Sequence, residues 1–134
     1  MTYVLTLLLL IVIGFAGYVR INPVPEARFT ARPGPSEVGI HKTASGVKVV
    51  VPLTDLPEDA LSKLTQIILS SPRTTQRGTE PAAFVTRSAL WRFPDVAVVW
   101  QDGDALHIHS ALVYGQSDLG VNSARVSTWI DALR

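Results

Sequence analysis

Two histidines are among the residues most able to do chemistry. His107 and His109 stand two positions apart in a run of alternating polar and apolar residues that is typical of a strand. Side chains two residues apart on a strand point to the same side, and metal sites use this spacing. A metal site needs further ligands, however, and His41 is the only other histidine. We therefore expect two solvent-facing histidines, with a metal site as the alternative.

A second candidate is the polar segment between the last predicted strand and the last predicted helix. Ser117 and Asp118 suit a turn, Gly120 permits a positive φ, and Asn122 is expected to be the helix N-cap. The functional alternative is an anion or carboxylate site, in which amides at the helix N-terminus bind the ligand with help from arginines. Asp118 would oppose such an anion. The candidate ligand-binding residues are Arg87, Arg92, Ser117, Asp118, Asn122 and Arg125.

Other kinds of catalytic chemistry have little support. The chain has no cysteine, no Gly-x-Ser-x-Gly motif, no phosphate-binding loop and no dinucleotide or zinc-protease motif. Ser110 follows His109, but no residue is identifiable that would orient this pair for catalysis. With 12 basic and 11 acidic residues, the net charge is +1, which predicts no nucleic-acid partner. We expect no cofactor, and a binding protein is favoured over an enzyme.

The elements that would position these residues begin with a strand and a helix. Residues 46–53 are rich in β-branched side chains and predict a strand. Pro57 suits the first position of a helix, and apolar residues then recur at helical spacing until Pro72. That apolar stripe predicts a helix that packs on the core.

From Arg73 onward the apolar period changes to two, which predicts an antiparallel meander. The predicted strands cover about residues 73–78, 83–91, 95–101 and 105–114, with Asp102-Gly103 as the last hairpin turn. We expect one joint apolar face to pack against the helices, made by Val96, Val98, Trp100, Leu106, Ile108 and Leu112.

The final segment, residues 121–134, is predicted to be a helix whose apolar stripe includes Trp129 and Ile130. The predicted fold class is α+β: a single N-terminal transmembrane helix followed by a two-layer domain, an antiparallel sheet packed by two helices. The predicted organisation is an anchor over residues 1–20, a Pro-rich linker over 21–36 and the domain over 37–134.

The anchor is predicted from residues 3–19, which carry no charged side chain before Arg20. A helix of this length is about 26 Å long, near the lower limit for crossing a hydrocarbon core of about 30 Å. A cleaved signal peptide, with Gly14-Phe15-Ala16 as its cleavage site, is the main alternative, and a buried core helix is another. A signal peptide normally has Lys or Arg before its apolar core, and this chain has only the terminal amine there.

Charge asymmetry bears on orientation. Arg20, Arg28 and Arg32 follow the apolar run closely, and no Lys or Arg precedes it. The positive-inside rule then favours a single-pass protein of the inner (plasma) membrane with its domain in the cytoplasm over an extracytoplasmic domain. The prolines of residues 21–36 predict an extended, semi-rigid linker that spaces the domain from the bilayer.

Two motifs point to a known family. Trp91-Arg92-Phe93-Pro94-Asp95, followed by Ser110, by Gly115-Gln116-Ser117-Asp118-Leu119-Gly120-Val121-Asn122 and by Arg125, resembles the domain-of-unknown-function family 1499. The resemblance runs from about Val47 to the C-terminus and includes Ser71-Pro72-Arg73-Thr74. It implies one domain after a short membrane segment and brings no established activity. Members usually carry a basic residue after the motif asparagine, where this chain has Ser123, which weakens the case for an anion site.

Two functions remain open. The first is a non-catalytic accessory or interaction subunit of a larger membrane protein complex, in which Gly14, Ala16 and Gly17 give a small-residue surface for helix packing. Its partners would be the lipid bilayer and other membrane-protein subunits. The alternative is a tethered small-ligand or anion-binding module, or an enzyme, with its site at the strand-to-helix turn around Asp118.

Overall fold

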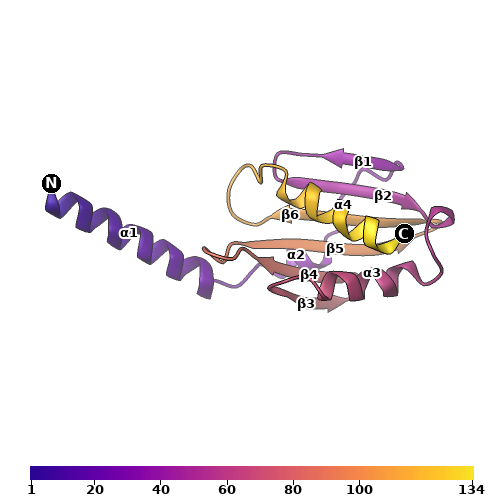
Figure 1. Ribbon diagram of the computed structural model, residues 1–134, viewed down its shortest axis with the longest axis horizontal. Helices are drawn as coiled ribbons and strands as arrows, with labels where there is room; N and C mark the ends of the chain where they lie inside the picture. The colour runs from indigo at the N-terminus through magenta and orange to yellow at the C-terminus, as the bar shows by residue number, and fades with distance from the viewer.

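The computed structural model describes all 134 residues and shows an apolar helix followed by one α+β domain, which confirms the predicted fold class (Figure 1). The elements are α1 (Thr2–Ile21), α2 (Ala27–Thr30), β1 (Gly39–Lys42), β2 (Gly46–Pro52), the 3-10 turn η1 (Leu53–Asp55), α3 (Ala60–Leu69), β3 (Thr74–Thr79), β4 (Ala82–Arg87), β5 (Pro94–Asp102), β6 (Ala105–Leu112) and α4 (Val121–Leu133).

The six strands form one antiparallel sheet in the order β1-β2-β6-β5-β4-β3. The β5–β6 hairpin turns at Gly103, which adopts a φ of 57° as the Asp-Gly pattern predicts. The edge strand β1 has only four residues and was not predicted. Its alternating exposure involves too few apolar residues to stand out in the sequence.

Helices α3 and α4 lie together on one face of the sheet, as predicted (Figure 1). Their apolar stripes are buried: Leu64 and Ile68 of α3 are 0% exposed, and Val126 and Trp129 of α4 are 1% and 3% exposed. The Trp129 indole N–H donates a hydrogen bond of 2.8 Å to Ser71 Oγ, which joins α4 to the end of α3. The sheet contributes Val47, Val49, Val51, Ala82, Phe84, Ala97, Val99, Leu106 and Ile108 to this core.

The register of β5 against β6 corrects the predicted apolar face. Trp100 lies opposite His107 and Val98 opposite His109, whereas Ile108 lies opposite Val99. Directly opposed residues of an antiparallel pair share one side of the sheet. Trp100 therefore lies on the face away from α3 and α4, because β5 is apolar on both sides and its period alone does not identify the helix-facing side.

That second face is covered by residues 22–36, which differ from the extended spacer that the prolines predict. The segment includes α2 and buries Val24 and Phe29 to 5% and 4% exposure against β4 and β5. Arg28 Nη2 donates to the Leu112 carbonyl at 2.8 Å, and Lys48 Nζ donates to the carbonyls of Pro33 and Pro35. The two apolar side chains place the segment on the sheet, so it packs as part of the domain.

Helix α1 projects from one end of the sheet (Figure 1). It is long and apolar enough to cross a membrane, with a mean hydropathy of 2.4, and signal sequences share these properties. Its last turns contact the domain: Val19 is 0% exposed, the rings of Phe15 and Phe93 are 6.0 Å apart, and those of Tyr18 and Tyr114 are 6.4 Å apart. The helix therefore joins the domain through packed side chains as well as through the chain itself.

Candidate functional site

The turn before α4 is built around the carboxylate of Asp118. Its Oδ1 accepts a hydrogen bond from the Gly120 N–H and its Oδ2 accepts one from the Asn122 N–H, both at 2.9 Å. Ser117 Oγ accepts from the Leu119 N–H at 3.3 Å, and Leu119 and Gly120 both adopt positive φ. Asp118 therefore supplies the cap that was expected of Asn122, which instead lies within the first turn of α4.

These hydrogen bonds stabilise the charged form of the Asp118 carboxyl. Burial by itself would raise its pKa, but the backbone N–H groups of Asn122 and Gly120 outweigh burial and lower the pKa below its ordinary value. Asp118 is thus a carboxylate whose charge is directed at the N-terminus of α4, where it also complements the helix dipole. An incoming anion would have to displace it.

Asn122 is the centre of a buried polar network. Its side chain is 0% exposed, and its Oδ1 accepts hydrogen bonds from Ser110 Oγ at 2.5 Å and from Arg125 Nη1 at 3.0 Å. The same Arg125 nitrogen forms an ion pair of 2.9 Å with Asp95 Oδ2. The network links α4 to the facing ends of β5 and β6. The buried Asn122 Nδ2 has no hydrogen-bond partner.

The six predicted ligand-binding residues fall into two groups. Ser117, Asp118, Asn122 and Arg125 lie together at the start of α4, as described above. Arg87 and Arg92 lie where α1 meets the domain: Arg87 Nη1 donates to the Arg92 carbonyl at 2.9 Å and to the Val19 carbonyl at 3.3 Å. Arg92 is exposed and has a φ of 62°. The hydrogen bonds of Arg87 thus join it to α1 and to the loop before β5.

The expectation of two solvent-facing histidines is wrong for His107, which is 3% exposed. Its ring stacks on Trp100 with the centroids 5.1 Å apart, and Lys48 Nζ lies 4.5 Å from the centre of the Trp100 ring. The packing of residues 22–36 on this face causes the difference. No group of three or more His, Asp or Glu side chains is arranged to hold a metal ion.

Burial and nearby positive charges favour the neutral form of both histidines. Burial, followed by the positive charge of Lys48, lowers the pKa of His107. Burial, followed by the charges of Arg28 and Lys48, lowers the pKa of His109 to about 4. Burial likewise lowers the pKa of Lys48, which is 2% exposed. The only signal of this cluster in the sequence is one lysine within the valine-rich run of β2.

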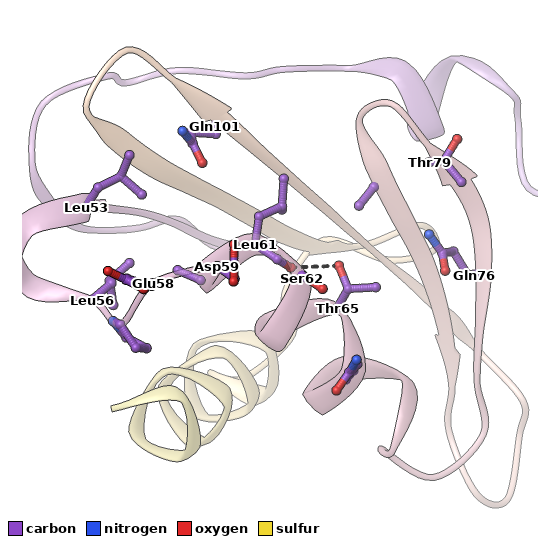
Figure 2. Close-up of a pocket in the computed structure, with 14 residues that line it drawn as sticks. Leu53, Leu56, Glu58, Asp59, Leu61, Ser62, Thr65, Gln76, Thr79 and Gln101 are labelled. Carbon is purple, nitrogen blue, oxygen red and sulfur yellow. Dashed lines mark hydrogen bonds between the residues drawn. The ribbon is translucent and has the colours of Figure 1, made fainter.

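The largest cavity lies elsewhere, between α3 and the sheet, near the β5–β6 hairpin (Figure 2). It has a volume of about 830 Å³ and combines apolar walls, such as Leu53 and Leu61, with the amides of Gln76 and Gln101. In Figure 2, the carbonyl of Leu61 accepts the one hydrogen bond drawn, from Thr65 Oγ1 at 2.9 Å. The sequence did not predict this groove, because its lining comes from separate elements.

A second groove runs beside the edge strand β1, with a volume of about 390 Å³. Val38 and Ile40 contribute apolar surface, at 62% and 65% exposure, and Ile130 and Arg134 at the C-terminal end of the chain also line the groove. Both grooves combine apolar walls with polar and charged side chains, among them Glu58 and Asp59 in the first and Asp131 and Arg134 in the second.

The predicted small-residue surface of α1 divides between two sides of the helix. Gly14 and Gly17 are three residues apart and share a side, and a Cβ added to either would meet nothing within 4 Å. At about 100° per residue, this side is roughly opposite Val19, whereas Ala16 lies on the same side as Val19; Gly14 is exposed, and Ala16 and Gly17 are both half-buried. Only the two glycines therefore face away from the domain.

Comparison with known proteins gives one match. A family model described as "Protein of unknown function (DUF1499)" matches residues 34–133, from the end of the segment that crosses the sheet to the end of α4. No curated protein and no solved structure matches the chain. The matched region includes both motifs from which the resemblance was drawn. Because the match covers most of the sequence, the chain belongs to the DUF1499 family of proteins of unknown function.

Proposed function

We propose that this protein is a single-pass, non-catalytic accessory subunit that uses α1 to associate with other membrane proteins. The observation that carries the proposal is the docking of α1 on the domain. Arg20 Nη2 donates to the Leu90 carbonyl at 3.0 Å, Arg87 reaches the Val19 carbonyl, and Asn22 Nδ2 donates to Tyr114 Oη at 2.8 Å. A partner that holds α1 would therefore also orient the domain.

The surface of α1 available to such a partner includes Gly14 and Gly17. Small residues let two helix backbones approach closely in the bilayer, where van der Waals packing drives association. The side that carries them points away from the domain, so a partner helix could pack there without displacing Phe15 or Val19 from their contacts. This arrangement supports a retained anchor over a cleaved signal peptide, because cleavage after Ala16 would remove Phe15 from the packed junction.

The domain is proposed to lie in the cytoplasm. Arg20, Arg28 and Arg32 all follow α1 on the domain side, and the positive-inside rule places such residues inside. A single cysteine at an exposed domain position tests this, since the chain has no other cysteine. Labelling by a membrane-impermeant reagent only after cell lysis is expected. Labelling of intact spheroplasts would contradict the cytoplasmic assignment.

Co-purification tests the subunit role. We expect the full chain, extracted in mild detergent, to migrate with stoichiometric partners on native gels and in native mass spectrometry. Gly14→Leu with Gly17→Leu should abolish this association while the domain stays folded. Leu8→Phe, which adds bulk about a third of a turn away from Gly14, is the matched control and should retain the partners. A wild-type chain that runs alone would refute the proposal.

The alternative function, a ligand site around Asp118, stays a prediction. The contacts there disfavour an anion, because Asp118 occupies two amides of α4 and its approach, and Arg125 is paired with Asp95. A site of this kind predicts that a bound ligand raises the melting temperature of the full chain. Asp118→Ala should remove that rise, and a rise that survives Asp118→Ala would place the ligand elsewhere.

A further inference from the structure

The end of the sheet next to α1 carries exposed apolar side chains. The loop of residues 88–93 joins β4 to β5, and within it Leu90 is 71% exposed and Trp91 is 41% exposed. Single exposed apolar residues are ordinary on protein surfaces. These two are adjacent in sequence and lie in the loop that contacts the apolar helix α1, so their surroundings depend on what surrounds α1.

Helix α1 fixes the height of this loop relative to a bilayer. The ring of Phe93 lies 6.0 Å from that of Phe15, which precedes Ile21 by six residues, or about 9 Å along the helix. A hydrocarbon core of about 30 Å needs about 20 helical residues, and α1 has 20 residues in total. When α1 spans the core, almost none of it extends beyond, so Phe15 lies about 9 Å inside the end of the core and Phe93 lies among the outer acyl chains.

The charges near the loop suit that depth. Arg20 and Arg92 are exposed, and the carbonyl of Leu90 accepts a hydrogen bond from Arg20. The two ion pairs of the structure involve Arg32 and Arg125, so neither Arg20 nor Arg92 is neutralised by a carboxylate of the chain. Guanidinium groups bind phosphate well, and Trp side chains favour the interface between headgroups and acyl chains.

We propose that the loop of residues 88–93 is a second membrane-contact element, in which Leu90 and Trp91 insert into the bilayer interface and Arg20 and Arg92 bind lipid headgroup phosphates. Arg87 holds this loop against α1 through the Val19 and Arg92 carbonyls. The sheet then stands end-on to the bilayer, with the β5–β6 hairpin at the end of the sheet away from α1 (Figure 1). The proposal rests on α1 being a retained anchor and requires no protein partner.

Single cysteines allow a direct test, because the chain has none of its own. We would label Leu90→Cys and the control Asp104→Cys with an environment-sensitive fluorophore and reconstitute each full chain in phosphatidylcholine–phosphatidylglycerol vesicles. Asp104 is exposed and follows the hairpin residue Gly103 at the opposite end of the sheet. Quenching by lipids with a nitroxide near the headgroup, and by aqueous iodide added to permeabilised vesicles, reports whether each label faces lipid or water.

The expected result is strong quenching of the label on Leu90→Cys by nitroxide lipid with little quenching by iodide, and the reverse for the label on Asp104→Cys. A loop label quenched mainly by iodide would overturn the inference, as would one that neither quencher reaches, since another protein chain would then cover the loop. Resistance to alkaline extraction is measured on the same vesicles. A chain that is extracted would overturn the anchor and this inference together, whereas a water-facing loop label on a resistant chain overturns this inference alone.

Discussion

Replacement of Asn122 by alanine should destabilise the domain, because Asn122 joins α4 to the sheet. The change removes the acceptor for Ser110 Oγ and one of the two side-chain acceptors of Arg125 Nη1. Ser110 is 0% exposed, so water does not replace the lost partner without rearrangement. Arg125 keeps its ion pair with Asp95.

The size of the effect follows from four contributions. Leaving the Ser110 hydroxyl without an acceptor costs about 1–3 kcal/mol, and the lost hydrogen bond from Arg125 costs about 1.5 kcal/mol, the low end for a charged donor because the side chain remains 21% exposed. Removal of the unpartnered Asn122 Nδ2 from the interior recovers about 1–3 kcal/mol. With a small loss of packing, the net cost should be about 2 kcal/mol.

A double-mutant cycle with Ser110→Ala isolates the interaction. The double variant leaves no unsatisfied serine hydroxyl, so it should cost less than the sum of the two single changes by about 1 kcal/mol. Urea unfolding of the full chain in detergent, followed by tryptophan fluorescence, measures each free energy of unfolding. Ser127→Ala, at an exposed position of α4, is the control and should stay within about 0.5 kcal/mol of wild type. Strictly additive single changes, or a cost for Asn122→Ala no larger than that of the control, would refute the assigned network.

Three further predictions test other parts of the fold. The pKa of His109 is about 4 in the folded chain and 6.5 ordinarily, so the unfolded chain binds more protons between these pH values. The contribution of His109 to the free energy of unfolding should be complete above about pH 6.5 and should fall toward pH 4, by less than roughly 3 kcal/mol. Urea midpoints at pH 7 and pH 5 measure this loss, which should be smaller in His109→Gln. Phe29→Ala should cost about 3–5 kcal/mol and expose residues 22–36 to limited proteolysis, whereas a free linker would be cut equally in wild type. Gly46→Ala should destabilise by at least about 1–3 kcal/mol, because its Cβ would lie 2.7 Å from Ala111 Cα, whereas Gly14→Ala, which meets nothing, should leave the melting temperature of the domain unchanged.

Much of the fold could be predicted from the sequence because its elements have strong local signals. The stripes of α3 and α4, the Asp-Gly hairpin and the alternating strands each follow from residue spacing. The predicted start of α3 at Pro57 was early, because Asp59 adopts a left-handed φ of 57° and the helix begins at Ala60. The φ of Asp59 depends on how the neighbouring residues pack, which residue spacing does not predict.

The covering of the second sheet face could not be predicted in the same way. Phe29 and Val24 are isolated apolar residues in a Pro-rich segment, and no periodicity connects them to the sheet. Without that cover, Lys48 and His107 are expected to be exposed side chains on a strand, although both are buried. These contacts join residues that are far apart in the sequence, so residue spacing does not predict them.

The candidate site was predicted in part by its residue types. The turn chemistry of Ser117 and Asp118 was expected, and the structure places both in that turn. Asp118 caps the helix instead of Asn122. Leu119 and Gly120 both adopt positive φ, and the turn brings the Asp118 carboxylate to the N–H groups of Gly120 and Asn122. The partners of Arg125 and Arg87 depend on strand register and on α1, which residue spacing does not determine.

Retention of α1 is the central claim, because both the proposed subunit role and the membrane-contact loop depend on it. The most direct test is the intact mass of the chain recovered from the membrane fraction of cells that express it. We expect a mass that includes Phe15 and the residues before it, in a chain that resists alkaline extraction. A shortened chain that begins at Gly17 and is found in the soluble fraction would contradict it.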